Sequence, residues 1–586
     1  MDDLAAKAGL WGVENGYHDV FGNWHGASAE TQRQLIAALS RGLERPPEIA
    51  PVSERIRAFQ GDGRRYWALG VQLYALRSHR NWGHGDFTDL ARLIPLAASC
   101  GAAAIGLNPL HALFPDRAQE ASPYAPNSRI FLNPLYIDLD AIPEFPGAAA
   151  AGIDLEDSRT GDLIDYEEVA RAKVDGLRLA YEHFVTSARP DRRADFERYR
   201  RHQSQRLLSF ACFETLRARF APEPWPEWPE PWRHPAPAQL KRLRRNERDQ
   251  CEFHEFVQWI AERQLRACQE LARASGMPIG LYVDLAVGIH PHGADAWSQQ
   301  DSVLADISVG APQDEFNPAG QDWGLVPFNP GALVAGDFAP LRLLMKSAMR
   351  HAGAIRLDHA LSLKRVFMIP RGYGASEGTY VRFPFEQSLR AIAQESLNAR
   401  CIVIGEDLGT VPEGFRETMM RWGFWSYRVM LFEREHDGRF RPPKAYPEQA
   451  VATFNTHDLA SLRGWLEAHD LRTKRGLGID PGESDEARAW GQQCLRLILS
   501  ERAGDYLADS DELFAVASFL AQTPSRLAVI ALEDILGTLE QINIPGTVDQ
   551  HPNWRRKLPV MLEDLEGCEP LCRVADVFAR AGRSFR

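Results

Sequence analysis

The chain has 586 residues, of which 45% are hydrophobic and 25% are charged. This composition is ordinary for a globular protein, and the absence of an uninterrupted run of about 18 apolar residues argues against a membrane span. With 67 basic and 79 acidic residues the formal net charge is −12, which disfavours nucleic acid as the main partner and fits a neutral partner better.

The first 60 residues predict a helical extension followed by a linker. The acidic start MDDLAAK lacks the charge pattern of a secretory signal, so we expect a cytoplasmic protein. Ser28 is a candidate N-cap for a helix whose apolar residues recur at helical spacing up to Gly42. The prolines at 45–54 then indicate a linker.

Eight short apolar runs that end in polar residues, Gly or Pro predict eight buried strands. They cover residues 65–74, 103–110, 278–287, 354–359, 402–408, 427–432, 450–458 and 527–536. Helical patterns lie between several of them, for example from Phe253 to Leu271 and after Pro340. Because parallel strands need a crossover element, this alternation predicts an α/β fold, a (β/α)8 TIM barrel.

Two gaps between these strands are too long for single βα units. We therefore expect a catalytic domain at 61–586 with inserted subdomains in its βα loops, at about 111–277 and 288–353.

A stretch rich in proline and tryptophan lies in the first insertion, PEPWPEWPEPWRHPAP at 222–237. The prolines predict a surface segment without helix or central strand. We expect Trp225, Trp228 and Trp232 to pack on the body of the protein rather than to bind a glucan.

Metal ligands are not indicated by the cysteines and histidines. The eight cysteines are scattered, which is typical of reduced thiols rather than of zinc sites or disulfides. His290 and His292 could coordinate a metal, but no third and fourth ligand follows at a usable spacing.

Four predicted strands end in or next to an acidic residue: Asp284, Asp358, Glu406 and Asp458. The carboxyl ends of barrel strands face the loops that form an active site, and buried carboxylates are costly unless they have partners or a function. Retaining glycosyl transfer needs such residues, because an ionised carboxylate attacks the anomeric carbon while a protonated carboxyl donates to the leaving oxygen.

The surroundings of these acids predict their roles. Arg356 lies two residues before Asp358, so both side chains point to one side of the strand, and we expect the guanidinium to lower the pKa of this predicted nucleophile. Glu406 follows a fully apolar strand, where desolvation raises a carboxyl pKa, and is the predicted acid/base residue. Asp458 and His457 are expected to hold sugar hydroxyls and to stabilise the transition state.

Longer stretches around these residues are GVQLYALRSHRNWGHGDFTDL (70–90), ASPYAPNSRIFLNPLYID (121–138), GMPIGLYVDLAVG (276–288), VGAPQDEFNPAGQDWGLVPFNP (309–330), AIRLDHALSLKRVFMIPRG (354–372), VIGEDLGTVP (403–412), TFNTHDLASLRGW (453–465) and INIPGTVDQHPNWRRKL (542–558). They resemble the 4-α-glucanotransferases called amylomaltases or disproportionating enzymes, which are related to the α-amylase superfamily. The likeness covers roughly residues 65–560.

The resemblance implies the same three catalytic positions as the chemistry does. It also implies substrate-binding residues around the donor sugar and over the acceptor side: Tyr124, Asp314, Gln321, Trp323, Arg356, His457 and Asn543. Asp284, at another predicted strand end, is a further substrate-binding candidate, with a strand-end hydrogen bond or ion pair as the open alternative. The family usually reads Gly-Ala-Pro-Pro-Asp where this chain has Gln313 before Asp314, so acceptor preference is left open.

The predicted activity is transfer of α-1,4-glucan segments from a maltooligosaccharide to the 4-hydroxyl of a glucan or glucose, without a metal or organic cofactor. An aromatic loop at 309–330 would keep water from the glucosyl-enzyme ester. Three alternatives stay open: an α-1,4-glucan hydrolase with the same residues, a catalytically silent glucan-binding protein, and a metal-dependent hydrolase that uses His359, His457 and Asp458. The sequence predicts no oligomeric state.

Overall fold

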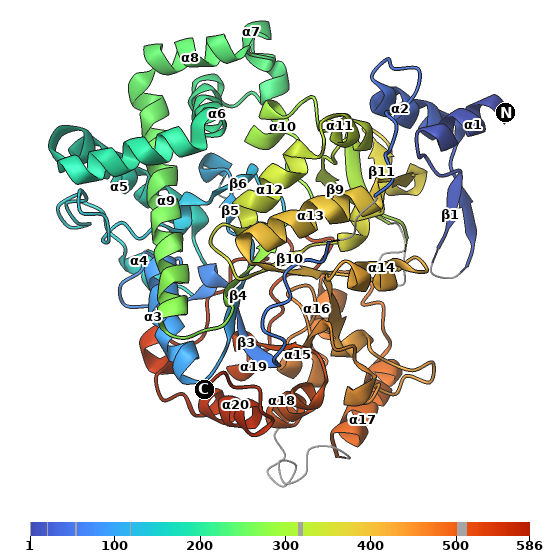
Figure 1. Cartoon of the computed structure of the whole chain (residues 1–586). Helices are drawn as coiled ribbons and strands as arrows, with labels where there is room; N and C mark the ends of the chain where they lie inside the picture. Colours follow the sequence, from blue (N-terminus) through green and yellow to red (C-terminus); the bar gives the residue numbers. More distant parts are fainter. Residues whose placement is uncertain (1, 20–21, 53–55, 118, 314–319, 501–511) are drawn as a thin grey trace.

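The computed structural model describes residues 2–19, 22–52, 56–117, 119–313, 320–500 and 512–586. At its centre lies a closed barrel of eight parallel strands surrounded by helices (Figure 1), which confirms the predicted fold. In their order around the barrel, the strands are β3 (Tyr66–Val71), β4 (Ala104–Leu107), β7 (Gly280–Leu285), β10 (Ala354–Leu357), β13 (Ile402–Gly405), β14 (Trp425–Val429), β15 (Ala450–Thr453) and β16 (Leu527–Ala531). Each strand overlaps one of the eight predicted apolar runs.

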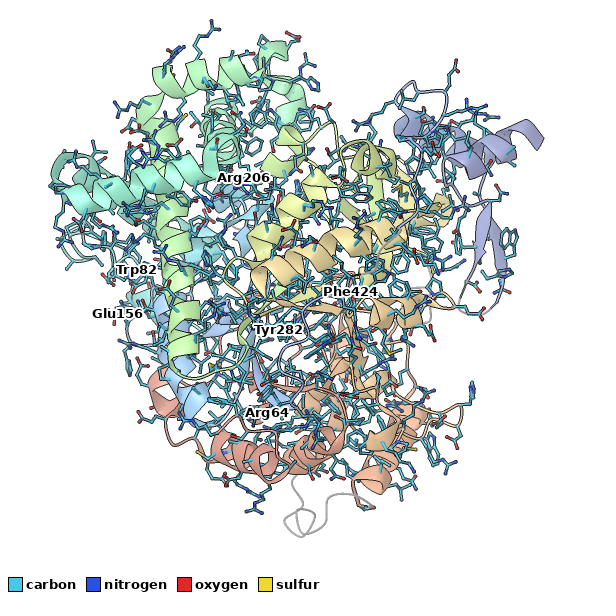
Figure 2. The ribbon with its side chains drawn as sticks, viewed as in Figure 1. Arg64, Trp82, Glu156, Arg206, Tyr282 and Phe424 are labelled. Atoms are coloured by element: carbon cyan, nitrogen blue, oxygen red, sulfur yellow. The ribbon has the colours of Figure 1, made fainter. Side chains whose placement is uncertain are left out.

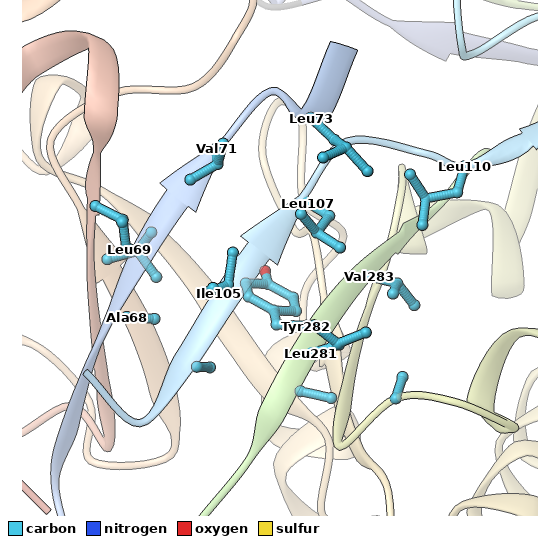
Figure 3. Close-up of a cluster of buried hydrophobic side chains, with 14 of the residues drawn as sticks. Ala68, Leu69, Val71, Leu73, Ile105, Leu107, Leu110, Leu281, Tyr282 and Val283 are labelled. Carbon is cyan, nitrogen blue, oxygen red and sulfur yellow. The ribbon is translucent and has the colours of Figure 1, made fainter. Parts of the chain in front are cut away.

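Neighbouring barrel strands hold apolar side chains at matching heights. Leu69 of β3 pairs with Ile105 of β4, and Ile105 pairs with Leu281 of β7. All three side chains are fully buried (Figure 3). Tyr282 lies near the centre of the molecule, among densely packed side chains (Figure 2). Strands covered on both faces need such continuous apolar runs, which is why the sequence indicates them clearly.

Helices cover the outside of the barrel. They include α3 (Phe87–Ser99), α9 (Arg248–Ala274), α12 (Ala339–Met349), α13 (Phe385–Ala399), α14 (Phe415–Arg421), α18 (Glu512–Gln522), α19 (Leu532–Ile535) and α20 (Glu569–Arg580). Between β15 and α18 the chain also forms α15 (Leu462–Leu466), α16 (His469–Gly476) and α17 (Asp485–Ser500). A capping box starts α3: the Asp86 carboxylate accepts from the backbone of Thr88 and Asp89, and the Asp89 side chain accepts from the Asp86 backbone.

Between β4 and β7 the chain forms a mostly helical subdomain at the upper left of Figure 1. Its elements are β5 (His111–Ala112), β6 (Ser128–Leu132), α4 (Glu156–Thr160), α5 (Tyr166–Ser187), α6 (Pro190–Phe220), α7 (Glu230–Arg233) and α8 (Pro237–Asn246). Trp225 and Trp228 are buried in its core, as expected. The expectation of a segment without helix is wrong at α7, because proline in the first turn of a helix removes no hydrogen bond.

A second, four-stranded sheet lies above the barrel and was not predicted. Its strands are β8 (Ile307–Ala311), β9 (Gln321–Leu325), β11 (Arg365–Pro370) and β12 (Thr379–Arg382), paired antiparallel in the order β12-β11-β8-β9. The short helices α10 (Ala294–Ser298) and α11 (Pro330–Ala335) flank β8 and β9 in the chain. The sheet thus joins the loop after β7 to the loop after β10.

The N-terminal residues form α1 (Asp2–Leu10), the hairpin of β1 (Gly16–His18) and β2 (Trp24–Gly26), and α2 (Ala29–Ser40). Ser28 caps α2 by accepting from the backbone N–H of Thr31 at 3.0 Å, as predicted. The sequence did not indicate α1 or the hairpin. Among the described residues, no helix is both long and apolar enough to cross a bilayer.

Candidate active site

Two of the strand-end acids leave adjacent strands side by side. In the pairing of β10 with β13, Leu357 lies opposite Gly405, so Asp358 and Glu406 follow at the same height. The backbone N–H of Glu406 donates to the carbonyl of Leu357 at 3.0 Å, and Ala360 donates to the carbonyl of Glu406 at 2.9 Å. The ladder therefore continues past the strand ends and fixes both backbones.

The guanidinium of Arg356 contacts three carboxylates. Its Nη1 atom lies 2.8 and 2.7 Å from the two oxygens of Asp284, which pairs with it on the neighbouring strand β7. Nη1 is also 3.1 Å from Oδ1 of Asp358, and Nη2 is 3.8 Å from Oε2 of Glu406. The side chain of Arg356 is only 9% exposed, so this charge is shared in a poorly solvated place.

Burial raises the pKa of both acids. The pKa of Asp358 rises to about 6 through desolvation, and Arg356 opposes this rise while Asp284 and Glu406 add to it. The expectation of a lowered Asp358 pKa is therefore wrong in its net direction: the arginine acts as expected, but burial outweighs it. Desolvation also raises the pKa of Glu406, as predicted, against Arg356 and the N–H groups of His359 and Leu408.

Asp458 lies in the loop that follows β15, among polar and aromatic side chains. Asn543 donates to its Oδ1 at 2.6 Å, and Nε2 of His457 lies 3.3 Å from its Oδ2. Desolvation opposes a low pKa here, but His457 and Asn543 hold the pKa of Asp458 below its usual range. The hydroxyl of Tyr124 donates to Asp284 at 2.6 Å, and its ring stacks on His457 with centroids 4.8 Å apart.

A cavity of about 810 Å³ opens at this end of the barrel. Its walls include the three acids and most of the predicted binding residues: Tyr124, Gln321, Trp323, Arg356, Asp358, Glu406, His457, Asp458 and Asn543. Asp284 lines a smaller cavity that shares Arg356 and His457 with the large one, and its carboxylate contacts Arg356 and Tyr124. Asp314 lies outside the described residues.

Residues that the sequence analysis did not assign to substrate also line the large cavity. His359 follows the proposed nucleophile with φ +46°, and its backbone N–H donates to Oε2 of Glu406 at 2.7 Å. Trp554 lies against Tyr124 and His457, with ring centroids 5.5 and 5.3 Å apart. Trp554 lies in the stretch 542–558 that resembles the family, but only the fold places it beside His457.

Within the part of the chain that the structure describes, no group of three or more His, Cys, Asp or Glu side chains is arranged to hold a metal ion. His457 and Asp458 instead contact each other, Tyr124 and Asn543.

The sequence matches the 4-alpha-glucanotransferase family over residues 71–563. A 4-alpha-glucanotransferase from Mycobacterium tuberculosis is 36% identical over 537 residues, which cover 86% of this chain and 73% of the relative. The corresponding protein of Haemophilus influenzae is 35% identical over 533 residues, with coverage of 85% and 76%.

Solved structures show the same architecture. Amylomaltase from Corynebacterium glutamicum superposes with a TM-score of 0.85 at 27% identity, covering 99% of this chain and 100% of the other. Amylomaltase from Streptococcus agalactiae in complex with acarbose shares the fold at 19% identity, with a TM-score of 0.73 and coverage of 89% and 100%. These similarities favour glucan transfer over the hydrolase alternative. The chain therefore belongs to the 4-alpha-glucanotransferase family and is an enzyme of that activity.

Proposed function

We propose that this enzyme moves α-1,4-glucan segments by a retaining double displacement in which Asp358 is the nucleophile and Glu406 the acid/base. The observation that carries the proposal is that both carboxyl groups emerge from adjacent strand ends and contact one buried guanidinium, that of Arg356. Retaining enzymes need two carboxyl groups about 5–5.5 Å apart, and neighbouring parallel strands hold side chains at this separation.

In the first step an oxygen of Asp358 attacks the anomeric carbon of the donor and forms a glucosyl ester. The glycosidic C–O bond breaks as Glu406 gives its proton to the departing oxygen. With a pKa of about 6, Asp358 is mostly ionised at neutral pH and can attack. The raised pKa of Glu406 favours the protonated form that the leaving group requires.

Asp458 supports the transition state in this proposal. The anomeric carbon gains positive charge as the bond breaks, and an ionised carboxylate stabilises that charge and the sugar hydroxyls beside it. The lowered pKa of Asp458 keeps it ionised, and Asn543 fixes one of its oxygens at 2.6 Å. Tyr124 and His457, stacked 4.8 Å apart, form one wall for the donor sugar.

In the second step the 4-hydroxyl of a glucan or glucose attacks the ester while Glu406 removes its proton. Asp358 then leaves as a carboxylate, and the new α-1,4 bond carries the segment. We propose that Gln321 and Trp323 guide this acceptor and limit the access of water. Trp323 packs edge-on against His359, with centroids 5.1 Å apart, directly beside Asp358.

Trapping the ester tests the two roles separately. α-Maltosyl fluoride needs no proton on its leaving group, so Glu406→Gln should form the ester and release it slowly. Intact-mass spectrometry of acid-quenched protein should then show one added maltosyl unit.

Asp358→Asn is the matched control for this experiment. It should carry no added mass, and its transfer from maltotriose should fall by at least about 10³-fold. An adduct on Asp358→Asn, or equal behaviour of the two variants, would contradict the assignment.

A further inference from the structure

The N-terminal residues 2–19 and 22–44 pack against the four-stranded sheet above the barrel. Val13 bridges to Val381 of β12, and Glu14 donates its backbone N–H to the carbonyl of Tyr380 at 2.8 Å. Arg382 donates to the carbonyl of Gly12 at 2.8 Å. A Cβ atom at Gly12 would lie 3.2 Å from the carbonyl oxygen of Arg382, so the two backbones approach closely.

An apolar core joins these residues to the sheet. It contains Trp11, Leu35, Ile36 and Leu39 from the N-terminal side and Leu304, Ile307, Val309, Leu325, Val366, Met368 and Val381 from the loops and sheet, and Trp323 packs against its edge. Because side chains of both parts interdigitate in one core, the sheet cannot move far without the N-terminal residues.

A polar contact reaches further, from the β1–β2 hairpin to the loop after β8. Nε2 of His25 lies 2.8 Å from Oδ2 of Asp19, and its ring stacks on Tyr17 with centroids 5.2 Å apart. The side-chain amide nitrogen of Gln313 lies 2.9 Å from Nε2 and 3.2 Å from Nδ1 of His25. Since Asp19 accepts the proton on Nε2, Nδ1 can accept from the amide of Gln313.

Gln313 lies two residues beyond the pairing that positions the acceptor side. At the end of β8, Gly310 pairs with Asp322 and Ala311 with Gln321 on β9. Gln321 and Trp323 line the active-site cavity from β9, and Nε1 of Trp323 donates to Oε1 of Gln321 at 3.2 Å. His25 is thus linked to the cavity wall by one side-chain contact and one strand pairing.

We propose that the N-terminal residues 2–19 and 22–44 position the acceptor side of the active site, and that His25 is a positioning residue that acts through Gln313 on Gln321 and Trp323. This inference rests on the acceptor role proposed above for Gln321 and Trp323. Without the contact, the ends of β8 and β9 are held less firmly, so an acceptor binds more weakly and water reaches the ester more often.

His25→Ala is the direct test. With amylose as saturating donor and maltose as the varied acceptor, the KM for maltose should rise about three- to tenfold, the scale of one lost hydrogen bond. The kcat at saturating maltose should stay within about twofold of wild type, and the ratio of transfer to hydrolysis, read from net reducing ends, should fall. His25→Gln keeps an acceptor for Gln313 and should restore the wild-type KM.

His18→Ala is the matched control, because His18 lies on the same hairpin and its ring contacts Gly22 and Trp24 within that hairpin. It should behave as wild type. An unchanged maltose KM in His25→Ala would overturn the proposal, as would a fall in kcat and thermal midpoint without a change in that KM.

Trp323→Ala tests the underlying assignment separately. An unchanged maltose KM in this variant would remove the acceptor role of Trp323. A raised KM there, together with wild-type behaviour of His25→Ala, would overturn the positioning role of His25 alone.

Discussion

The positive charge of Arg356 offsets the negative charges of the carboxylates in the active site. Its single positive charge lies against Asp284, Asp358 and Glu406, while burial favours the neutral form of the last two. Because Asp358 and Glu406 interact, their protons leave in steps that belong to the pair. The proposed reaction needs one proton on the pair, so activity should pass through a maximum between the two steps.

Changes to the charges around Asp358 should shift the acid limb of the pH profile in opposite directions. Arg356 lowers the Asp358 pKa, so Arg356→Gln should move the limb from about pH 6 upwards by about one to three units. Asp284 raises the same pKa, so Asp284→Asn should move the limb downwards. The measurement is kcat/KM for maltotriose against pH.

Both variants will also lose activity, since the two side chains bind each other. The test therefore compares the pH of the acid limb between variants, not the height of the kcat/KM maximum. Shifts of the same sign in both variants would show that Asp358 does not control this limb.

Among the elements, β8 and β9 hold Gln321 and Trp323, the residues proposed to guide the acceptor. Gly310 of β8 has no room for a side chain: a Cβ atom there would lie 2.1 Å from the carbonyl oxygen of Gln321 and 2.8 Å from Cδ1 of Ile369. Any larger residue must therefore push β9 away from β8.

Gly310→Ala should raise the KM for the acceptor by about 10- to 100-fold, because small displacements of positioning groups have large effects on rate. Cleavage of the donor should persist, since Asp358 and Glu406 lie on the barrel strands. The assay with amylose and varied maltose measures both quantities.

Gly374→Ala is the control for this substitution. Gly374 lies between β11 and β12, where the nearest atom to a new Cβ would be Oγ of Ser376 at 3.9 Å. A wild-type acceptor KM in Gly310→Ala would contradict the role of the β8–β9 pairing.

The barrel strands and the strands of the second sheet differ in how far the sequence could predict them. The barrel strands are continuous apolar runs such as Ile402–Gly405, so composition and spacing reveal them, and the acids at their ends follow from the chain direction. The second sheet is different: Gln321–Leu325 alternates exposed and buried residues and pairs with segments from another loop. Its partners depend on long-range packing, as does the contact of His25 with Gln313.

For the whole molecule, charge matters less than the net value of −12 suggests. The substrate is neutral, and Arg356 and its three partners lie inside the barrel mouth, where ions screen weakly. The kcat/KM for maltotriose should change by less than about twofold between about 0.05 and 0.5 M NaCl. A tenfold fall would show that long-range attraction contributes to binding.

A sheet built from two βα loops also constrains how this enzyme can be altered. The β8–β9 and β11–β12 hairpins share one ladder, with Phe367 opposite Gly310 and Ile369 opposite Ser308. A chimera that imports either hairpin alone from a relative would leave mismatched edges, so the two hairpins have to be inherited together. The N-terminal residues that pack on this sheet would have to be exchanged with it. The N-terminal segment and the two hairpins are therefore a single unit for recombination.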